Sequence, residues 1–253
     1  MDQKAILTGT LHDSDLSVHA YRQSLWEPAL VAREYATLER LAQRRLDRTG
    51  WLRFDELDEE QTFLAAVAEV RPLRVLDVGC GDGRLASMIA APEVVCADSS
   101  PAAVDAAAGR GLDAQLADAA DLPFPDGSFD VVTCNHTLYH LADIDAVLGE
   151  FVRVLRPGGR FAGIYNTPEH LHEVFGDDPP ETFDSESGLP HLQAHFASVA
   201  RLYRGGSVMW LTQRDLQTYL DAFVELYGQL VAPDGPYPFT ATRRKCVFVA
   251  DAA

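Results

Sequence analysis

Between Leu73 and Tyr165 the chain alternates short apolar runs with helix-forming segments, and this alternation constrains the fold more than any other feature. Apolar runs of strand length lie at residues 73–78, 94–97, 112–116, 129–134 and 160–165. Helices are expected at residues 84–90, 101–110 and 144–155. Strands that alternate with helices form a parallel sheet with helices on both faces, and continuous apolar strands fit that burial. The sequence therefore predicts an α/β, doubly wound sheet.

The segments on either side of this region are less regular. Residues 17–48 have apolar side chains at helical spacing, and "FDELDEEQTFLAAVAEV" reads as a further helix with acidic residues from Asp55 to Glu60 at its front. We expect residues 1–70 to form an N-terminal helical cap or lid. Residues 71–253 would hold the sheet, with insertions at about 167–212.

The last third of the chain predicts two helices within residues 168–196, a strand at 199–204 and a final strand in "KCVFVA". A helix is expected at 213–223, with Thr212 as its N-cap and Asp215 three residues on, which is nearly a capping box. No pattern here predicts a second folding domain.

The charge of the chain limits its partners. The formal net charge is −17, and the longest basic cluster is Arg243 to Lys245, which is too short to line a nucleic-acid groove. We therefore expect no nucleic-acid partner and no membrane partner, whereas neutral or cationic small molecules are compatible. A homodimer is also compatible with the sequence.

The cysteines and the N-terminus suggest a compartment. Cys80, Cys96, Cys134 and Cys246 show no CxxC spacing, which indicates reduced thiols in the cell interior. The N-terminus is polar and acidic rather than basic and then apolar, and no apolar run approaches the roughly 18 residues of a membrane span. We expect a cytoplasmic protein.

Three glycines fall within five positions of "RVLDVGCGDGRL", residues 74–85, directly after the first apolar run. Glycine lets the backbone come close to a ligand. A phosphate loop of the form GxxxxGK[ST] needs a lysine and a hydroxyl residue that do not follow Gly83. The dinucleotide fingerprint GxGxxG would need a glycine where Arg84 stands. The loop reads GxGxG, with Asp77 two residues before Gly79.

Polar side chains recur at the predicted strand ends. Asp98 ends the second strand, 21 positions after Asp77, where a carboxylate can accept both hydroxyl protons of a ribose. Asp118 and the small Ala119 follow the third strand, where an adenine could lie with its amine donating to the carboxylate. Asn135 ends the fourth strand. In an open parallel sheet, ligands bind at this edge.

These motifs together resemble the class I S-adenosylmethionine-dependent methyltransferases of the small-molecule type. The resemblance covers residues 73–165 and rests on "VLDVGCGDG", the acid in "VCADSS", "LADAADLPFPDGSFDVV" and "VLRPGGRF". It implies a Rossmann-like seven-stranded sheet whose last strand is antiparallel, and S-adenosyl-L-methionine as cofactor. Such a cofactor is cationic and carries no phosphate, which agrees with the absence of lysine between Lys4 and Lys245.

The resemblance also assigns cofactor contacts. The methionine end would meet Asp77 and the loop Gly79, Cys80, Gly81 and Gly83. The ribose would meet Asp98 and Ser99, and the adenine Asp118 and Ala119. Asn135 and His136 would line the cofactor near the transferred methyl group.

The acceptor side is predicted from the segments after the fourth and fifth strands and from the N-terminal helix. His136 and His140, in "NHTLYHL", are candidate general bases, because a histidine near neutrality can take a proton from a hydroxyl or amine. Both could instead have structural roles, and without a third ligand we expect no metal. The candidate acceptor contacts are Tyr21, Arg22, Trp26, Tyr139, His140, Tyr165, Asn166 and His170. Packing is the simpler interpretation of Trp26, Met209 and Trp210.

The predicted activity is methyl transfer to an oxygen or nitrogen of a small-molecule acceptor, in bacterial specialised metabolism. The protein would supply alignment, exclusion of water and one base. An RNA or protein methyltransferase, and a non-catalytic S-adenosylmethionine-binding protein, are the alternatives.

Overall fold

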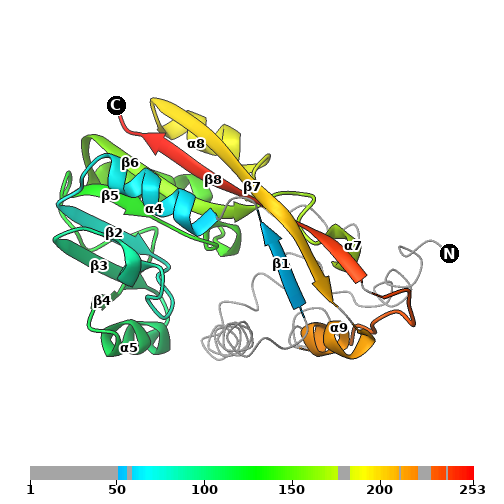
Figure 1. Cartoon of the computed structure of the whole chain (residues 1–253). Coiled ribbons are helices and arrows are strands. Elements are labelled where there is room, and N and C mark those ends of the chain that lie inside the picture. Colours follow the sequence, from blue (N-terminus) through cyan, green and yellow to red (C-terminus); the bar gives the residue numbers. More distant parts are fainter. Residues whose placement is uncertain (1–50, 56–58, 176–182, 211, 222–228, 238) are drawn as a thin grey trace. The chain divides into compact units, whose positions relative to one another are not determined.

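The computed structural model describes residues 51–55, 59–175, 183–210, 212–221, 229–237 and 239–253 (Figure 1). The helical pattern at 17–48 and the candidate contacts Tyr21, Arg22 and Trp26 lie outside these residues. Contacts divide the chain into two compact units, each described by itself below. Unit 1 takes its residues from three separate segments of the chain: one that ends at residue 56, residues 169–179 and residues 205–244. Because no single stretch encodes it, the sequence pattern did not predict this second unit.

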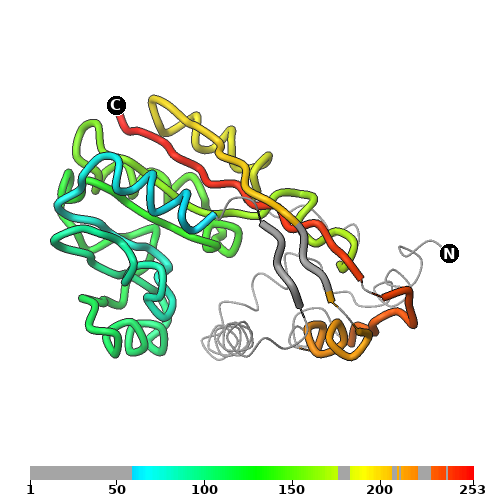
Figure 2. The backbone as a smooth tube through the Cα atoms, viewed as in Figure 1, coloured from blue at the N-terminus to red at the C-terminus, as the bar shows by residue number. Residues whose placement is uncertain are grey.

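Unit 2 holds the sheet. Its strands are β2 (Arg74–Val78), β3 (Glu93–Asp98), β4 (Asp113–Leu116), β5 (Phe129–Thr133), β6 (Leu155–Asn166) and the parts of β7 (Ser198–Trp210) and β8 (Phe239–Asp251) outside residues 205–244. Among the described residues of unit 2, the order is β7-β8-β6-β5-β2-β3-β4. Strands β2 to β6 pair in parallel, and β8 runs antiparallel to β6. The Rossmann-like seven-stranded sheet with an antiparallel last strand is therefore confirmed. Figure 2 follows the chain through these strands.

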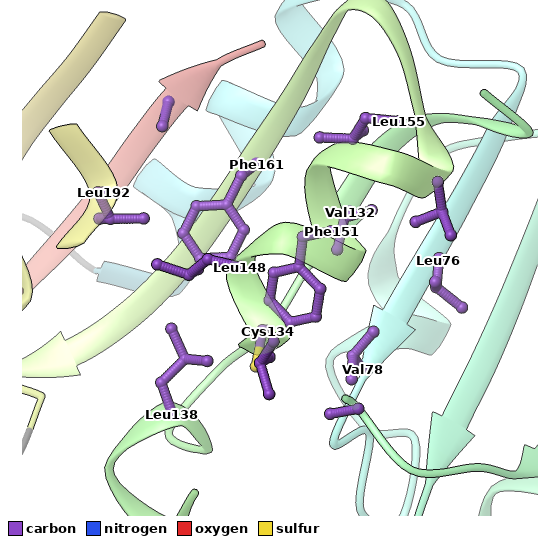
Figure 3. Close-up of a cluster of buried hydrophobic side chains, with 14 of the residues drawn as sticks. Leu76, Val78, Val132, Cys134, Leu138, Leu148, Phe151, Leu155, Phe161 and Leu192 are labelled. Carbon is purple, nitrogen blue, oxygen red and sulfur yellow. The ribbon is translucent and has the colours of Figure 1, made fainter. Parts of the chain in front are cut away.

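Alternate residues of the central strands face opposite sides of the sheet. Leu76 and Val132 belong to one buried cluster, whereas their neighbours Val75 and Val131 belong to another. The first cluster lies under α6 (Ile144–Val154), and Figure 3 shows Phe151 of this helix close to Phe161 of β6. Their ring centroids are 5.8 Å apart. Both faces are therefore covered, which is why the strands read as continuous apolar runs.

Helices enclose the sheet. α5 (Pro101–Gly109) begins at Ser100, whose hydroxyl accepts a hydrogen bond from the Ala103 amide. α6 begins after Asp143, which caps it in the same way, and α8 (Gly188–His195) contacts α6. These helices match the predicted ones within a few residues.

Two predicted helices differ from the structure. The helix expected at 84–90 is a single 3-10 turn, η1 (Ala86–Met88), because the Arg84 amide donates to Asp82 Oδ1 in a local turn. The acidic residues expected at the start of one helix, from Asp55 onward, belong to two elements. Asp55 is the last residue of strand β1, and α4 (Glu59–Glu69) begins at Glu59.

α4 packs on β6 of the sheet, although the sequence placed it in the cap. Arg160 of β6 fixes it, with Nη1 donating to the Ala66 carbonyl at 3.1 Å and to Glu69 Oε2 at 2.7 Å.

Unit 1 has its own apolar cluster. β1 (Trp51–Asp55) pairs antiparallel with β7, with Asp55 opposite Gly206. The other described elements of this unit are α7 (His172–Phe175), α9 (Gln213–Leu220) and the part of β8 before residue 245. Trp210 is buried at its centre, so its expected packing role is confirmed. The capping box of Thr212 and Asp215 is present. In the described parts of the chain, no helix is long and apolar enough to cross a membrane.

Candidate cofactor site

The carboxyl ends of β2, β3, β4 and β5 lie at one edge of the sheet in unit 2. After β2 the chain builds β3 and β4 on one side, and then returns to place β5 and β6 on the other side. This reversal is the topological switch point, where open α/β sheets bind ligands. Asp77 of β2 and Thr133 of β5 are register partners across it.

The glycine loop follows β2 and folds over the end of β3. Gly79, Gly81 and Gly83 have φ values of +67°, +57° and +73°, a region that residues with a side chain rarely adopt. The amides of Gly79 and Cys80 both donate to the Ala97 carbonyl, at 2.8 and 3.3 Å. A Cβ on Gly79 would lie 2.4 Å from Thr137. The loop thus needs glycine for its conformation and for close packing.

Asp98 ties the end of β3 to this loop. Its Oδ2 accepts a hydrogen bond of 2.9 Å from the Gly81 amide, and its Oδ1 accepts one of 2.9 Å from the Ser100 amide. The side chain is 6% exposed. Burial raises the pKa of Asp98, and the backbone amides partly offset this. Each oxygen keeps a second lone pair, so the carboxylate can still accept two ligand hydroxyls.

Asp77 is a buried carboxyl beside the loop. Burial, partly offset by a hydrogen bond from Thr133 and reinforced by the charge of Asp98, raises its pKa to about 7. Within the described residues, neither Asp77 nor Asp98 forms a salt bridge with a cationic side chain. Two buried carboxyls without a cation favour a positively charged ligand at this edge.

The next strand end carries Asp118 and Ala119. Asp118 is exposed, and its Oδ1 accepts a hydrogen bond of 2.9 Å from the Ala120 amide. Ala119 is buried in the main cluster, and Ser99 is exposed directly after Asp98. These positions keep the predicted order along the edge.

The segment after β5 carries the candidate bases. Asn135 Oδ1 accepts a hydrogen bond of 3.0 Å from the Ile164 amide, which anchors this segment to β6. His136 has a φ of +52°, a strained conformation for a residue with a side chain. Tyr139 and His140 lie in η2 (Leu138–His140), with ring centroids 4.3 Å apart. Both histidines are half-buried.

Three of the remaining acceptor candidates, Tyr165, Asn166 and His170, have other partners in the structure. Tyr165 is fully buried between Phe183 and Phe248, and its hydroxyl donates to the Cys134 carbonyl at 2.5 Å, which gives it a packing role. Asn166 Oδ1 accepts a hydrogen bond from Lys245 Nζ. His170 belongs to unit 1, where its Nδ1 accepts from the Arg244 amide at 3.2 Å.

Two residues of this edge were missed by sequence reasoning. Thr133 donates from Oγ1 to Asp77 Oδ1 at 2.6 Å, and Thr137 donates to the Asn135 carbonyl at 2.9 Å and packs on Gly79. The available signal was Thr133 itself, a hydroxyl within the otherwise apolar run "VVTC", residues 131–134.

S-adenosyl-L-methionine fits these residues. Its ammonium and sulfonium charges suit the two buried carboxyls, its ribose suits the free lone pairs of Asp98, and its lack of phosphate suits a loop without lysine. In the described part of the chain, no group of three His, Cys, Asp or Glu residues could hold a metal ion.

Part of the chain is similar to known methyltransferases. Residues 76–163 match the family model described as "Methyltransferase domain". Residues 76–163 are therefore similar to a methyltransferase domain, and the sheet that holds them has the class I arrangement. S-adenosyl-L-methionine is the cofactor that this match supports. A demethylmenaquinone methyltransferase of Thermus thermophilus is 47% identical over 102 residues, which cover 36% of this chain and 46% of that protein. A 27-O-demethylrifamycin SV methyltransferase of Amycolatopsis mediterranei is 38% identical over 122 residues, covering 42% of this chain and 45% of that protein.

The fold also matches solved structures. The YcgJ protein of Bacillus subtilis aligns with a TM-score of 0.55 at 19% identity, over 76% of this chain and 97% of that one. The [4+2]-cyclase SpnF aligns with a TM-score of 0.56 at 21% identity, over 79% and 86%. At these identities the likeness concerns the fold alone. The chain spans about half the length of the first curated relatives, between 46% and 61%.

Proposed function

We propose that the protein transfers the methyl group of S-adenosyl-L-methionine to a small-molecule acceptor, at an oxygen or nitrogen atom, in bacterial specialised metabolism. The observation that carries this proposal is the pair of buried carboxyls, Asp77 and Asp98, at adjacent strand ends beside a loop of left-handed glycines. A cationic nucleoside without phosphate is the ligand that this arrangement would favour.

In this proposal the site residues bind and align the cofactor. Asp98 and Ser99 hold the ribose, Asp118 and Ala119 the adenine, and Asp77 with Gly79, Cys80, Gly81 and Gly83 the methionine end. When bound, the cofactor supplies an electrophilic methyl group. The protein places this group in line with the acceptor and excludes water from it, which converts a bimolecular step into an aligned one.

His140 or His136 is proposed to take the acceptor's proton. Both residues lie on the segment that follows β5, next to the switch point, and an imidazole near neutrality suits a hydroxyl or amine acceptor. Tyr139, Asn135 and Asn166 are proposed to line the same region.

The names of the relatives guide the choice of acceptor. They include demethylmenaquinone methyltransferases and a 27-O-demethylrifamycin SV methyltransferase, which are small-molecule enzymes. The matched segments cover 36%, 58% and 42% of this chain, and other relatives are named as C-methyltransferases of quinone biosynthesis. Demethylated quinones, which test a carbon acceptor, and demethylated alcohols, which test the proposed oxygen acceptor, therefore lead a test panel rather than identify the substrate.

The test is a transfer screen with S-adenosyl-L-methionine carrying a labelled methyl group. Purified protein is incubated with metabolite pools, an RNA fraction, a protein fraction and the two lead acceptor classes. The proposal expects label in the small-molecule fraction, attached to oxygen or nitrogen. Label only in RNA or protein contradicts the small-molecule acceptor, and label on carbon contradicts the acceptor atom. Cofactor binding without transfer to any fraction favours the non-catalytic alternative.

A further inference from the structure

Thr133 is a buried polar residue of the edge that the cofactor assignment does not use. It lies in β5 and is completely buried, and its Oγ1 is 2.6 Å from Asp77 Oδ1 and 3.4 Å from the Leu76 carbonyl. The hydroxyl has one proton, so the short contact is the one that it donates to. A hydroxyl costs free energy when it is buried, and here that cost is offset at a single carboxyl oxygen.

The strand register fixes this pair. Thr133 is the parallel register partner of Asp77, and Val131 is the partner of Val75 two residues earlier. Both pairs share one face of the sheet, because side chains alternate along each strand. Thr133 therefore reaches Asp77 sideways from the neighbouring strand, at the switch point itself.

The Asp77 carboxyl has no other fixed support. Among the described residues, the hydrogen bond from Thr133 is the only one that Asp77 accepts. Asp98, by contrast, accepts backbone amides on both oxygens. One oxygen of Asp77 is thus held by Thr133, and the other is left for a ligand.

We propose that Thr133 is a positioning residue for cofactor binding: its hydroxyl holds one oxygen of Asp77 so that the other meets the ammonium group at the methionine end of the cofactor. This inference rests on the proposed function. Thr133 acts through Asp77 and does not itself touch the cofactor.

The surroundings of Asp77 give the inference a measurable signature. Within the part of the chain that the structure describes, the titratable groups that interact with Asp77 are Asp98 from β3, Cys80 from the glycine loop, Cys134 after β5 and Tyr165 from β6, and none of these four is a cation. Burial raises the pKa of Asp77 to about 7, and the Thr133 hydrogen bond acts against that rise. Binding of a cation near neutrality should therefore release a proton, and loss of the hydroxyl should move this release to higher pH.

The experiment is calorimetric titration of the full chain with S-adenosylhomocysteine, whose ammonium group is that of the cofactor. Wild type, Thr133→Val and Thr133→Ser are compared between pH 6 and 9, in buffers that differ in ionisation enthalpy. Thr133→Val keeps the side-chain volume and removes the hydroxyl, whereas Thr133→Ser keeps the hydroxyl. Thr133→Ala is a second way to remove the hydroxyl if the valine variant is not recovered folded.

We expect Thr133→Val to bind about tenfold more weakly at pH 7, the usual range for a lost hydrogen bond to a charged group. The loss of affinity in Thr133→Val, relative to wild type, should become smaller as the pH rises. The pH at which binding releases a proton should be higher in this variant by about one pH unit. Thr133→Ser should follow wild type. In an Asp77→Asn background, Thr133→Val should leave the pH profile unchanged, because the group that it acts through is gone.

The outcomes separate the two proposals. If wild type binds S-adenosylhomocysteine and Thr133→Val binds it with the same affinity and the same pH profile, the role of Thr133 is overturned. The cofactor assignment then stays in place. A deficit that is constant across the pH range also overturns it, since that is what altered packing alone would give. Wild type that fails to bind at every pH overturns the proposed function itself.

Discussion

The Asp98 carboxylate accepts a hydrogen bond of 2.9 Å from the Gly81 amide, and this bond joins the end of β3 to the glycine loop that follows β2. The same carboxylate accepts the Ser100 amide at the start of α5. Asp98 thus organises the loop, and in the proposed function the same carboxylate also holds the ribose.

We predict that Asp98→Ala weakens binding of S-adenosylhomocysteine by about 1–3 kcal/mol, the usual cost of leaving buried donors without a partner. Calorimetry measures the change. Asp113→Ala is the matched control, because Asp113 is an exposed carboxylate on the neighbouring strand β4. Equal affinities for Asp98→Ala and wild type would show that Asp98 does not hold the ribose.

The glycine loop gives a prediction about stability. Gly79→Ala should destabilise the protein by roughly 1–3 kcal/mol, since Gly79 has a φ of +67° and a Cβ there would lie 2.8 Å from Thr137 Cβ. Gly109→Ala is the control, because nothing lies within 4 Å of its position at the end of α5. The two midpoints of urea unfolding should differ clearly, and coincident midpoints would refute the packing role assigned to Gly79.

Much of this fold could be predicted from the sequence, because its signals are local. The strands from Arg74 to Tyr165 are apolar runs, and the capping box at Thr212 depends on residues three apart. Unit 1 could not be predicted in this way, because it joins β1, α7 and α9 from distant segments. The prediction of a helix at residues 84–90 was wrong, because the Arg84 amide donates to the Asp82 side chain in a local turn instead of to a helix.

The candidate site divides in the same way. The positions of Asp77 and Asp98 near the ends of β2 and β3 were predictable, because each follows apolar residues of a strand-length run. The contact between Thr133 and Asp77 depends on the register of β2 with β5, 56 residues apart along the chain, and a single sequence carries no direct sign of that pairing. The burial of Tyr165 was missed for a related reason, since its neighbours Phe183 and Phe248 come from later segments.

The buried Asp77 predicts a pH dependence of stability in the absence of ligand. Its pKa is raised from 3.8 to about 7, so the folded state holds the proton more tightly than the unfolded state does. This tighter proton binding adds to the free energy of unfolding. The contribution is fully present below pH 4 and is lost as the pH rises to about 7. It amounts to roughly 4 kcal/mol, at about 1.4 kcal/mol per pKa unit.

Asp77→Asn removes this titration. We expect the variant to gain stability relative to wild type as the pH rises from 5 to 8, measured by urea unfolding at each pH. A constant difference between the two proteins over that range would mean that Asp77 is already ionised in the folded protein.

The Cys80 thiol should react slowly despite its place in the glycine loop. Its pKa is raised by the neighbouring Cys96 thiol and by burial, which keeps it protonated. Alkylation by iodoacetamide at pH 8, followed by mass spectrometry of the Cys80 peptide, should run well below the rate of free cysteine. Modification as fast as free cysteine would contradict this environment.

The central claim is tested most directly by titrating the wild-type chain with S-adenosylhomocysteine in a calorimeter, next to the same titration with NAD and ATP. We expect saturable binding of one S-adenosylhomocysteine per chain, displaced by S-adenosyl-L-methionine, and no binding of either phosphate-bearing nucleotide. Absence of heat with S-adenosylhomocysteine at millimolar concentration, or preferential binding of NAD or ATP, would contradict it.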